Sequence, residues 1–350
     1  ISPCMPLVLA SHCTIFLTSF ATGVGAAALY FGLRHGVRGA RALSLAWGVY
    51  ITAGFVYILK TVGALPNTGW TTWSLPLGSA FEMIVISVGL GLRYTDIRRE
   101  EARARMRLEA IDRELQIARR VQESILPDDV PDLPGVACVT HYEPNIAVGG
   151  DQYEFAEYRN PPGLGVLVTA ATGHGVPSAM MASMIKIAFA NQRDHGNDPT
   201  RLLSSINRTI CTHSDQSLAS GAYVYLDLNA RRVSYVTAGH PPLIYRPAGG
   251  AAVEVENRGA LLGWRSDHDY PAAHFDVQVG DLLILYTDGL IEAQNAVGEF
   301  FGEQRLLAVI DRHANRSAAE LKERILDAYR LWILETGPMD DVALVIVEVT

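Results

Sequence analysis

Residues 1–33 contain no Asp, Glu, Lys or Arg, whereas charged residues are dense later in the chain, as in Asp96–Arg120. A stretch this long without charge is rare in soluble helices, so a membrane segment is predicted at the start. Basic residues are outnumbered too: 29 Lys and Arg against 37 Asp and Glu give the 350 residues a net charge of −8. Binding of nucleic acid requires a basic surface that displaces counterions, and no nucleic-acid partner is therefore expected.

Cysteine is scarce too, with four residues in the chain. They are Cys4, Cys13, Cys138 and Cys211, and they form no CxxC pair and match no set of histidines. Zinc sites and disulfide frameworks need such spacings, so neither is predicted.

Three apolar stretches precede the charged region: Pro6–Leu33, Ala42–Leu59 and Leu75–Leu92. Each approaches or exceeds the ~20 residues with which a helix crosses the hydrocarbon core, which predicts a membrane domain over residues 1–93. The alternative is that they are buried helices of a soluble protein. Because the chain opens at Ile1 with neither Met nor a basic segment, we expect it to be part of a longer protein.

The arginines beside these stretches predict their orientation. Arg34, Arg38 and Arg41 lie between the first two stretches. Arg93 follows the third stretch, whereas Gly63–Ser74 carries no charge. Positively charged loops stay on the cytoplasmic side, so the uncharged loop is expected outside and everything after Arg93 in the cytoplasm.

A linker helix is predicted for residues 94–126, because Arg93–Leu126 contains no Gly or Pro. Its apolar residues recur at alternating spacings of three and four, with one polar exception, and form a heptad seam. The seam consists of Leu108, Ile111, Leu115, Ala118, Gln122 and Ile125. Such a helix is expected to pair with its twin in a homodimer; the alternative is an amphipathic helix that lies on the next domain.

Residues 127–350 show a different pattern, in which short β-like runs lie among helical segments. The strand-like runs are Leu164–Val168, Ala222–Leu228, Arg232–Ala238, Leu282–Tyr286 and Val342–Val349. The helical segments are Ser178–Asn191, Pro199–Cys211, Gln304–His313 and Ala318–Thr336. Helix pairs in the middle and near the end predict an α+β domain of two sheets covered by helices on both outer faces.

Three acidic motifs lie next to apolar strands: Asp151 follows two glycines, Asp288 precedes Gly289, and Asp340 precedes Asp341. Carboxylates at strand ends are able to converge, and hard cations such as Mg²⁺ and Mn²⁺ take several oxygen ligands. Two such ions neutralise the charge that develops on a transferred phosphoryl group. Each Asp-Gly pair taken singly is more often an ordinary turn, so the prediction rests on the set.

The membrane domain contains the segments GVRGARALSLAW, LPNTGW and LPLGSAFEMIVISVGLGLRYTDIRREE. These resemble the end of the seven-helix sensor domains found in bacterial receptors with diverse intracellular modules. The resemblance implies that further membrane helices and a periplasmic sensor precede Ile1. It also implies a multi-pass protein of the cell inner membrane.

Residues 114–350 contain, in order, ELQIARRVQESILP, YEPNIAVGGDQYEF, TGHGVPSAM, TAGHPP, GDLLILYTDGLIEAQN, FGEQRL and MDDVALVIV. These motifs resemble the SpoIIE/RsbU-like branch of the PPM-type Ser/Thr protein phosphatases. The resemblance implies a PPM-type β-sandwich flanked by helix layers, two Mn²⁺ or Mg²⁺ ions, and metal-dependent hydrolysis of phosphoserine or phosphothreonine. It also implies a phosphorylated regulatory protein, such as an anti-sigma-factor antagonist, as the partner.

Carried over residue by residue, the family's catalytic and metal-binding acids fall on Asp151, Asp288 and Asp340. The family also has an aspartate that bridges both metals before the GHG turn, and the matching residue here is Ala170. The resemblance further implies that Ala171 offers its backbone carbonyl to a metal. Loss of a bridging carboxylate is expected to cost more than the ~10- to 100-fold that follows from changing a ligand-orienting group.

Two functions stay open at this point. The chain is either an active phosphatase whose membrane part sets its activity through the linker helix, or a pseudophosphatase. The second would bind a partner or relay a signal without turnover, because Ala170 has removed the bridge. Glu154, where the family more often has Asp, keeps a carboxylate, but we do not expect it to replace the bridge. His174 and His240 are expected to brace their turns rather than to act as general acids.

We predict that a Cys introduced at Leu108 or Leu115 forms disulfide crosslinks between two copies of the chain in native membranes. The seam places both positions on the pairing face, and a Cys at Arg113, on the opposite face, is the control. Gel electrophoresis after mild oxidation gives the result. A lack of self-contact at both seam positions would remove the dimer model.

Overall fold

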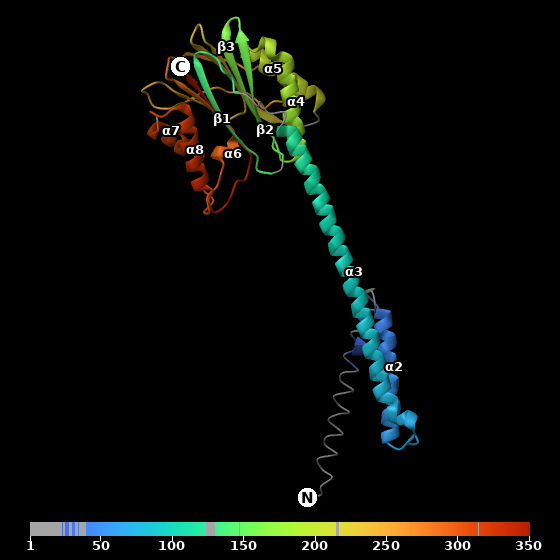
Figure 1. Cartoon of the computed structure of the whole chain (residues 1–350). Coiled ribbons are helices and arrows are strands. Elements are labelled where there is room, and N and C mark those ends of the chain that lie inside the picture. Colours follow the sequence, from blue (N-terminus) through green and yellow to red (C-terminus); the bar gives the residue numbers. More distant parts are fainter. Residues whose placement is uncertain are drawn as a thin grey trace. The chain divides into compact units, whose positions relative to one another are not determined.

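The structure, a computed structural model, describes residues 40–123, 130–146, 148–214, 217–313 and 315–350, and a few positions between 23 and 34. The chain divides into two compact units, Ile1–Ala110 and Ile111–Thr350, which are considered separately (Figure 1). The predicted first membrane stretch, Pro6–Leu33, lies outside the described residues apart from those few positions.

Two long helices dominate the described part of the N-terminal unit, and the second continues into the C-terminal unit. Helix α2 spans Ala40–Thr61 and α3 spans Gly69–Glu123, so they contain the second and third predicted stretches. Both have an apolar window long enough to cross a membrane, and only 6% of each window is buried. Core helices of a soluble protein would be mostly buried, so this exposure favours membrane helices over the alternative.

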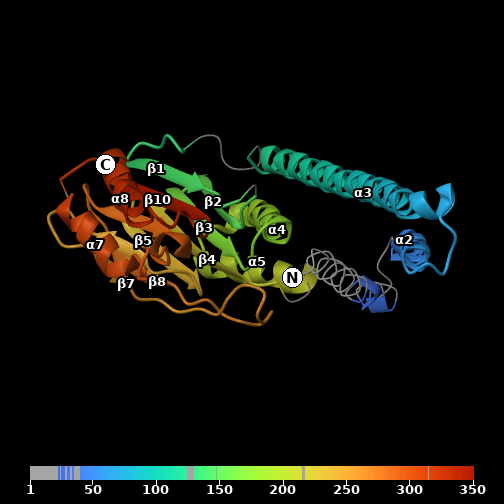
Figure 2. The same ribbon diagram turned by 90° about the horizontal axis from the view of Figure 1, so that it is seen from below.

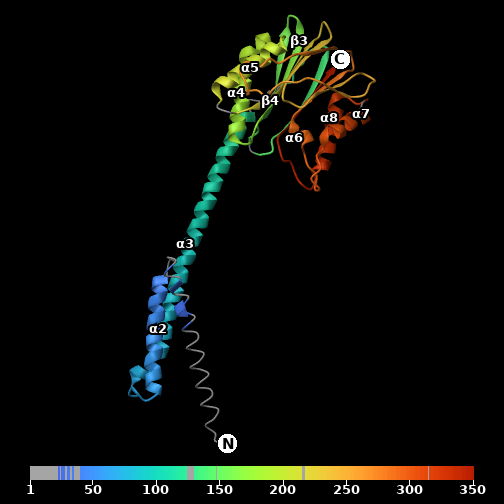
Figure 3. The same ribbon diagram turned by 180° about the vertical axis from the view of Figure 1, so that it is seen from behind.

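The C-terminal unit is built on two five-stranded antiparallel sheets that face each other (Figures 1 and 3). The first sheet has the order β1-β10-β9-β6-β7, with β1 (Val136–Glu143), β6 (Leu243–Arg246), β7 (Val253–Val255), β9 (Leu282–Tyr286) and β10 (Val342–Val349). The second has the order β2-β3-β4-β5-β8, with β2 (Asp151–Arg159), β3 (Pro162–Ala171), β4 (Ala219–Asp227), β5 (Arg232–Ala238) and β8 (Ala273–Asp276).

Helices cover the outer face of each sheet (Figures 2 and 3). The second sheet carries α4 (Val176–Gln192), the short η1 (Arg193–His195) and α5 (Pro199–His213). The first sheet carries α7 (Gly302–Arg312) and α8 (Ala318–Trp332), and the single turn α6 (Asp288–Ile291) follows β9. Side chains of Asp198 and Ser317 accept backbone N–H bonds at the starts of α5 and α8, as N-cap residues do.

Strand residues alternate between two cores, because successive side chains point to opposite faces of a sheet. In β9, Leu283 and Leu285 lie in the core between the sheets, whereas Ile284 lies in the core beneath α7 and α8. A third core, which includes Ile185 and Ile206, joins the second sheet to α4 and α5. This order of helix, sheet, sheet and helix confirms the predicted fold class.

We predict that Leu283→Ala lowers the free energy of unfolding of the C-terminal unit by about 2–5 kcal/mol, because it leaves a cavity between the two sheets. Leu283 is 0% exposed, whereas Leu334, the matched control for a Leu→Ala change, is 77% exposed. The control is expected to change stability by less than about 0.5 kcal/mol. Denaturant unfolding followed by circular dichroism measures both, and equal effects would contradict this account of the core.

Candidate metal centre

The three predicted acids lie at the ends of strands from both sheets. Asp151 is the first residue of β2, Asp288 begins α6 just after β9, and Asp340 lies just before β10. Strands β9 and β10 are hydrogen-bonded neighbours, with Tyr286 opposite Leu344, so Asp288 and Asp340 emerge at the same end of the first sheet. Strand β10 also contacts β2 of the second sheet.

Asp151 is the most buried of these acids, with 4% of its surface exposed. Loss of hydration raises the pKa of its carboxyl group well above the usual value, and the charges of Asp341, Asp288 and Asp340 raise it further. A hydrogen bond with Thr287 acts in the opposite direction. The four carboxylates are therefore close enough to repel one another.

The other two predicted acids are perturbed in the same direction. Burial raises the pKa of Asp288, and the nearby charge of Glu292 adds to the effect. Burial likewise raises the pKa of Asp340, with contributions from the charges of Asp288 and Asp341, while His174 lowers it. A cluster of acids that resist ionisation is the electrostatic signature of a site that favours cations.

The acidic residues fit a divalent cation, but they are not arranged as a complete set of ligands around one ion. The Oδ2 atom of Asp151 is buried and has no hydrogen-bond partner among the residues that the structure describes. Within the same residues, no three His, Cys, Asp or Glu side chains are grouped closely enough to hold one ion. A desolvated oxygen without a donor, next to other carboxylates, fits Mg²⁺ or Mn²⁺, whose ligands are oxygen atoms.

Ala170 lies directly beside Asp151, as its partner in the β2–β3 ladder. At the position to which the sequence resemblance assigns a bridging acid, a methyl group therefore lies beside Asp151. The next residue, Ala171, donates its N–H to the carbonyl of Gly150 (3.1 Å). A Cβ on Gly150 would lie 3.0 Å from the Ala171 carbonyl oxygen, so this glycine lets the start of β2 approach the end of β3.

Both carboxylate oxygens of Asp341 accept hydrogen bonds from the loop before β2, and Asp341 thereby holds this loop. Its Oδ1 accepts from the N–H of Asn145 (2.8 Å) and its Oδ2 from the N–H of Gly150 (2.6 Å). The sequence identified Asp341 only as a neighbour of Asp340. No local pattern signals this role, because the partners are about 190 residues away in the chain.

A second residue with an unpredicted role is Gln122, the polar member of the heptad seam. Its side chain is hydrogen-bonded to the backbone of Gly149, two residues before Asp151. The polar interruption of an apolar seam is a signal that sequence reasoning could have used to find it.

The GHG turn has the backbone geometry that its glycines predict. Gly173 and Gly175 have φ angles of 90° and 79°, which favour glycine. His174 is exposed, whereas Nδ1 of the buried His240 lies 2.8 Å from Oγ of Ser220. Burial lowers the pKa of His240 to about 3, so the ring is neutral at physiological pH and holds its turn against β4.

Glu154 points away from the acidic cluster. It is the third residue after Asp151 in β2, so the two side chains lie on opposite faces of the strand. Glu154 forms an ion pair with Lys186 of α4. Burial raises the pKa of this carboxyl group, and Lys186 partly offsets the rise. Glu154 is therefore in no position to replace a bridging carboxylate at Ala170.

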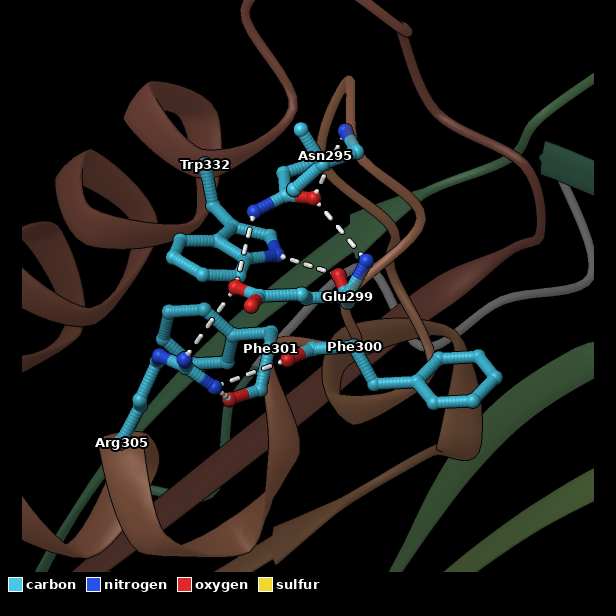
Figure 4. Close-up of polar contacts among 7 residues, drawn as sticks. Asn295, Glu299, Phe300, Phe301, Arg305 and Trp332 are labelled. Carbon is cyan, nitrogen blue, oxygen red and sulfur yellow. Dashed lines mark hydrogen bonds and ion pairs between the residues drawn. The ribbon is translucent and has the colours of Figure 1, made fainter.

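The segment after α6, at Glu299–Phe301, is bound to α7 and α8 (Figure 4). Arg305, in the FGEQRL motif, donates to the carbonyls of Phe300 (2.9 Å) and Phe301 (3.1 Å). Its guanidinium carbon lies 4.2 Å from the centroid of the Trp332 ring. The indole N–H of Trp332 in turn donates to the backbone carbonyl of Glu299 (3.2 Å).

Two family models match the chain. Residues 160–350 match the model described as Stage II sporulation protein E (SpoIIE), and residues 1–93 match that described as 7TM diverse intracellular signalling. The phosphoserine phosphatase RsbU of Bacillus subtilis (strain 168) is 27% identical over 248 residues, which cover 70% of this chain and 72% of RsbU.

Solved structures share the fold of the C-terminal unit. The PP2C domain of SiaA from Pseudomonas aeruginosa has a TM-score of 0.63 at 22% identity, over 69% of this chain and 98% of that chain. A structure of the SpoIIE phosphatase domain of Bacillus subtilis with a fragment of its regulatory domain has a TM-score of 0.53 at 16% identity, over 61% and 63%. The C-terminal unit therefore has a PP2C-like fold.

We predict that the metal-free protein loses stability as pH rises from about 4, the usual aspartate value, through the raised pKa of Asp151. The folded state holds this proton more tightly than the unfolded state, so ionisation disfavours folding. Asp151→Asn removes the penalty and is expected to raise the melting temperature at neutral pH in EDTA, while abolishing part of the stabilisation by added Mn²⁺.

The exposed residue Asp132 supplies the control, because Asp132→Asn removes a carboxylate that is already hydrated. Thermal melting at several pH values, with EDTA and then with Mn²⁺, measures each protein. If Asp151→Asn melts like the parent at neutral pH in EDTA, the buried carboxylate does not carry the penalty described here.

Proposed function

Because the chain belongs to the SpoIIE family of PPM-type Ser/Thr phosphatases, we propose that it is a membrane-anchored signalling phosphatase. Its substrate is phosphoserine or phosphothreonine on a small regulatory protein, such as an anti-sigma-factor antagonist. The observation that supports this most directly is that the buried Asp151 is influenced by the charges of Asp288 and Asp340, and that the carboxyl pKa values of all three are raised. The likeness to the phosphoserine phosphatase RsbU adds the class of substrate.

Asp151, Asp288 and Asp340, with the carbonyl of Ala171, are the residues that would hold two Mn²⁺ or Mg²⁺ ions. When bound, such ions supply a water of lowered pKa and positive charge beside the phosphoryl oxygens. The chain's own contribution is to hold Asp151 in a fixed and poorly hydrated position. Burial of Asp151 and the hydrogen bonds of Asp341 to the loop before β2 serve that purpose.

The domain organisation of this proposal has three parts. Residues 1–93 form a membrane domain, 94–126 a linker helix, and 127–350 the phosphatase domain. The match to the 7TM signalling model and the two exposed apolar helices support the first part. By the distribution of arginines, the phosphatase domain lies in the cytoplasm, and the seam of the linker helix supports a homodimer.

A second candidate is a pseudophosphatase that binds its partner without turnover. The specific observation in its favour is Ala170, a methyl group in register with Asp151 at the family's bridging position. Glu154 does not compensate, because it pairs with Lys186 on the other face of β2. The two candidates differ in whether three carboxylates suffice for catalysis.

We predict Mn²⁺-dependent hydrolysis of a phosphoserine peptide and of a small phosphoester by the full chain. Asp288→Asn is expected to lower the rate about 100-fold or more, because it removes a direct metal ligand. Ala170→Asp is expected to raise the rate, since it adds the bridging carboxylate. Release of inorganic phosphate measures all three proteins, with Asp132→Asn as the control for a neutralised surface carboxylate.

The same assay separates the two candidates. Turnover by the Ala170→Asp protein alone would favour a disabled enzyme. A lack of turnover in both proteins, despite intact folding, would favour a binding role and contradict the proposed hydrolysis.

A further inference from the structure

The C-terminal end of α3 is hydrogen-bonded to the loop that leads into β2. The Nε2 atom of Gln122 donates to the carbonyl of Gly149 (2.5 Å), and its Oε1 accepts from the N–H of Gly149 (3.0 Å). Both polar groups of one backbone residue are thus matched by the two ends of one side-chain amide. Two bonds fix the rotation of the loop as well as its distance from the helix, which a single bond does not.

The opposite side of the same loop is held by Asp341, which accepts hydrogen bonds from Asn145 and Gly150. A Cβ atom on Gly149 would lie 2.6 Å from Oδ2 of Asp341, so the fit requires a glycine. Gly149 and Gly150 are therefore enclosed between α3 and the acidic cluster. The next residue along the chain is Asp151, the most buried acid of that cluster.

Gln122 lies on the half-buried face of α3. Leu115 and Ala118 share this face and are also half-buried, whereas Leu108 and Ile111 are 66% and 54% exposed. The later described positions of the heptad seam are thus half-buried and the earlier ones exposed; the final seam residue, at position 125, lies outside the described residues. The contact to Gly149 explains why an amide occupies a position that a seam usually gives to an apolar side chain.

We propose that Gln122 is a positioning residue, through which the linker helix holds the Gly149–Gly150 loop and sets the place of Asp151. The inference rests on the proposed function, because it assigns the control of the same metal centre. A shift or rotation of α3 that withdraws Gln122 frees one side of the loop, and the Asp151 carboxylate loses its fixed position. Loss of two partly buried hydrogen bonds should increase opening of the loop on the order of 10-fold.

Amide hydrogen exchange in the metal-free full chain, in detergent micelles, tests this directly. Gln122→Leu removes both hydrogen bonds and keeps a side chain of similar size, so exchange of the Gly149 and Gly150 amides is expected to accelerate on the order of 10-fold. Gln116→Leu is the matched control, because Gln116 is exposed on the same helix and its side chain donates to Asp112, one turn earlier. The control should leave exchange at both glycines unchanged.

Mn²⁺ affinity, measured by calorimetry on the same proteins, is the second readout. Gln122→Leu should weaken binding while the melting temperature of the metal-free protein stays near that of Gln116→Leu. Equal exchange at Gly149 and Gly150 in the two variants would overturn the proposal. If Gln122→Leu loosens the whole unit, seen as faster exchange in β4, Gln122→Glu decides instead: it keeps the acceptor for Gly149 and should accelerate exchange less than Leu.

These measurements separate the positioning role from the phosphatase itself. Hydrogen exchange is measured without metal and without substrate. Its result therefore does not depend on whether the chain hydrolyses phosphoserine. If the parent protein binds no Mn²⁺ but Gln122→Leu still accelerates exchange at the two glycines, the metal centre is wrong and the coupling of helix to loop stands.

Discussion

A carboxylate that loses its hydration needs a proton, a donor or a cation in return, and Asp151 is under this constraint. Its Oδ2 atom has no donor within the described part of the chain, and three other carboxylates lie near it. The surrounding structure keeps the acid in this unfavourable place. Strand β9 pairs with β10, and β10 contacts β2 of the other sheet, so the ends of these strands lie together; the glycines before β2 allow the loop to pack against Asp341.

Ala170 changes the balance of charge within this cluster. A fourth free carboxylate at this position would add repulsion to the group, and the methyl group avoids it. The row that begins with Asp151 and Ala170 continues across the sheet to Ser220, which contacts His240. Because burial keeps His240 neutral, this polar pair adds no charge to the cluster.

The apolar strands could be predicted from the sequence, and the long-range contacts could not. Leu282–Tyr286 and Val342–Val349 were predicted with the observed bounds, because strands covered on both faces are continuously apolar. Strands β1 and β2 were not predicted. In β2, Asp151 and Glu154 interrupt the apolar pattern, and the second is accommodated by Lys186, 32 residues away.

Some residues of the candidate site could likewise be predicted from the sequence, and others could not. Motif order identified the acids at strand ends, because each lies beside a recognisable run of residues. The roles of Asp341 and Gln122 depend on backbone groups that become neighbours only after folding, and no local spacing encodes them. The polarity of Gln122 was visible in the seam, but its partner was not.

The unbroken path of α3 from Gly69 to Glu123 gives the number of residues before Gln122 a meaning of its own. Each residue added to an α-helix turns the segment on its N-terminal side by about 100° relative to the segment on its C-terminal side. A single insertion between the apolar stretch and Gln122 would thus turn the apolar stretch by about 100° about the helix axis, while seven residues would restore its original direction to within about 20°. The number of residues in this segment therefore sets the rotation between the apolar stretch and Gln122. Natural relatives with the same contact should differ in the length of this segment by whole heptads.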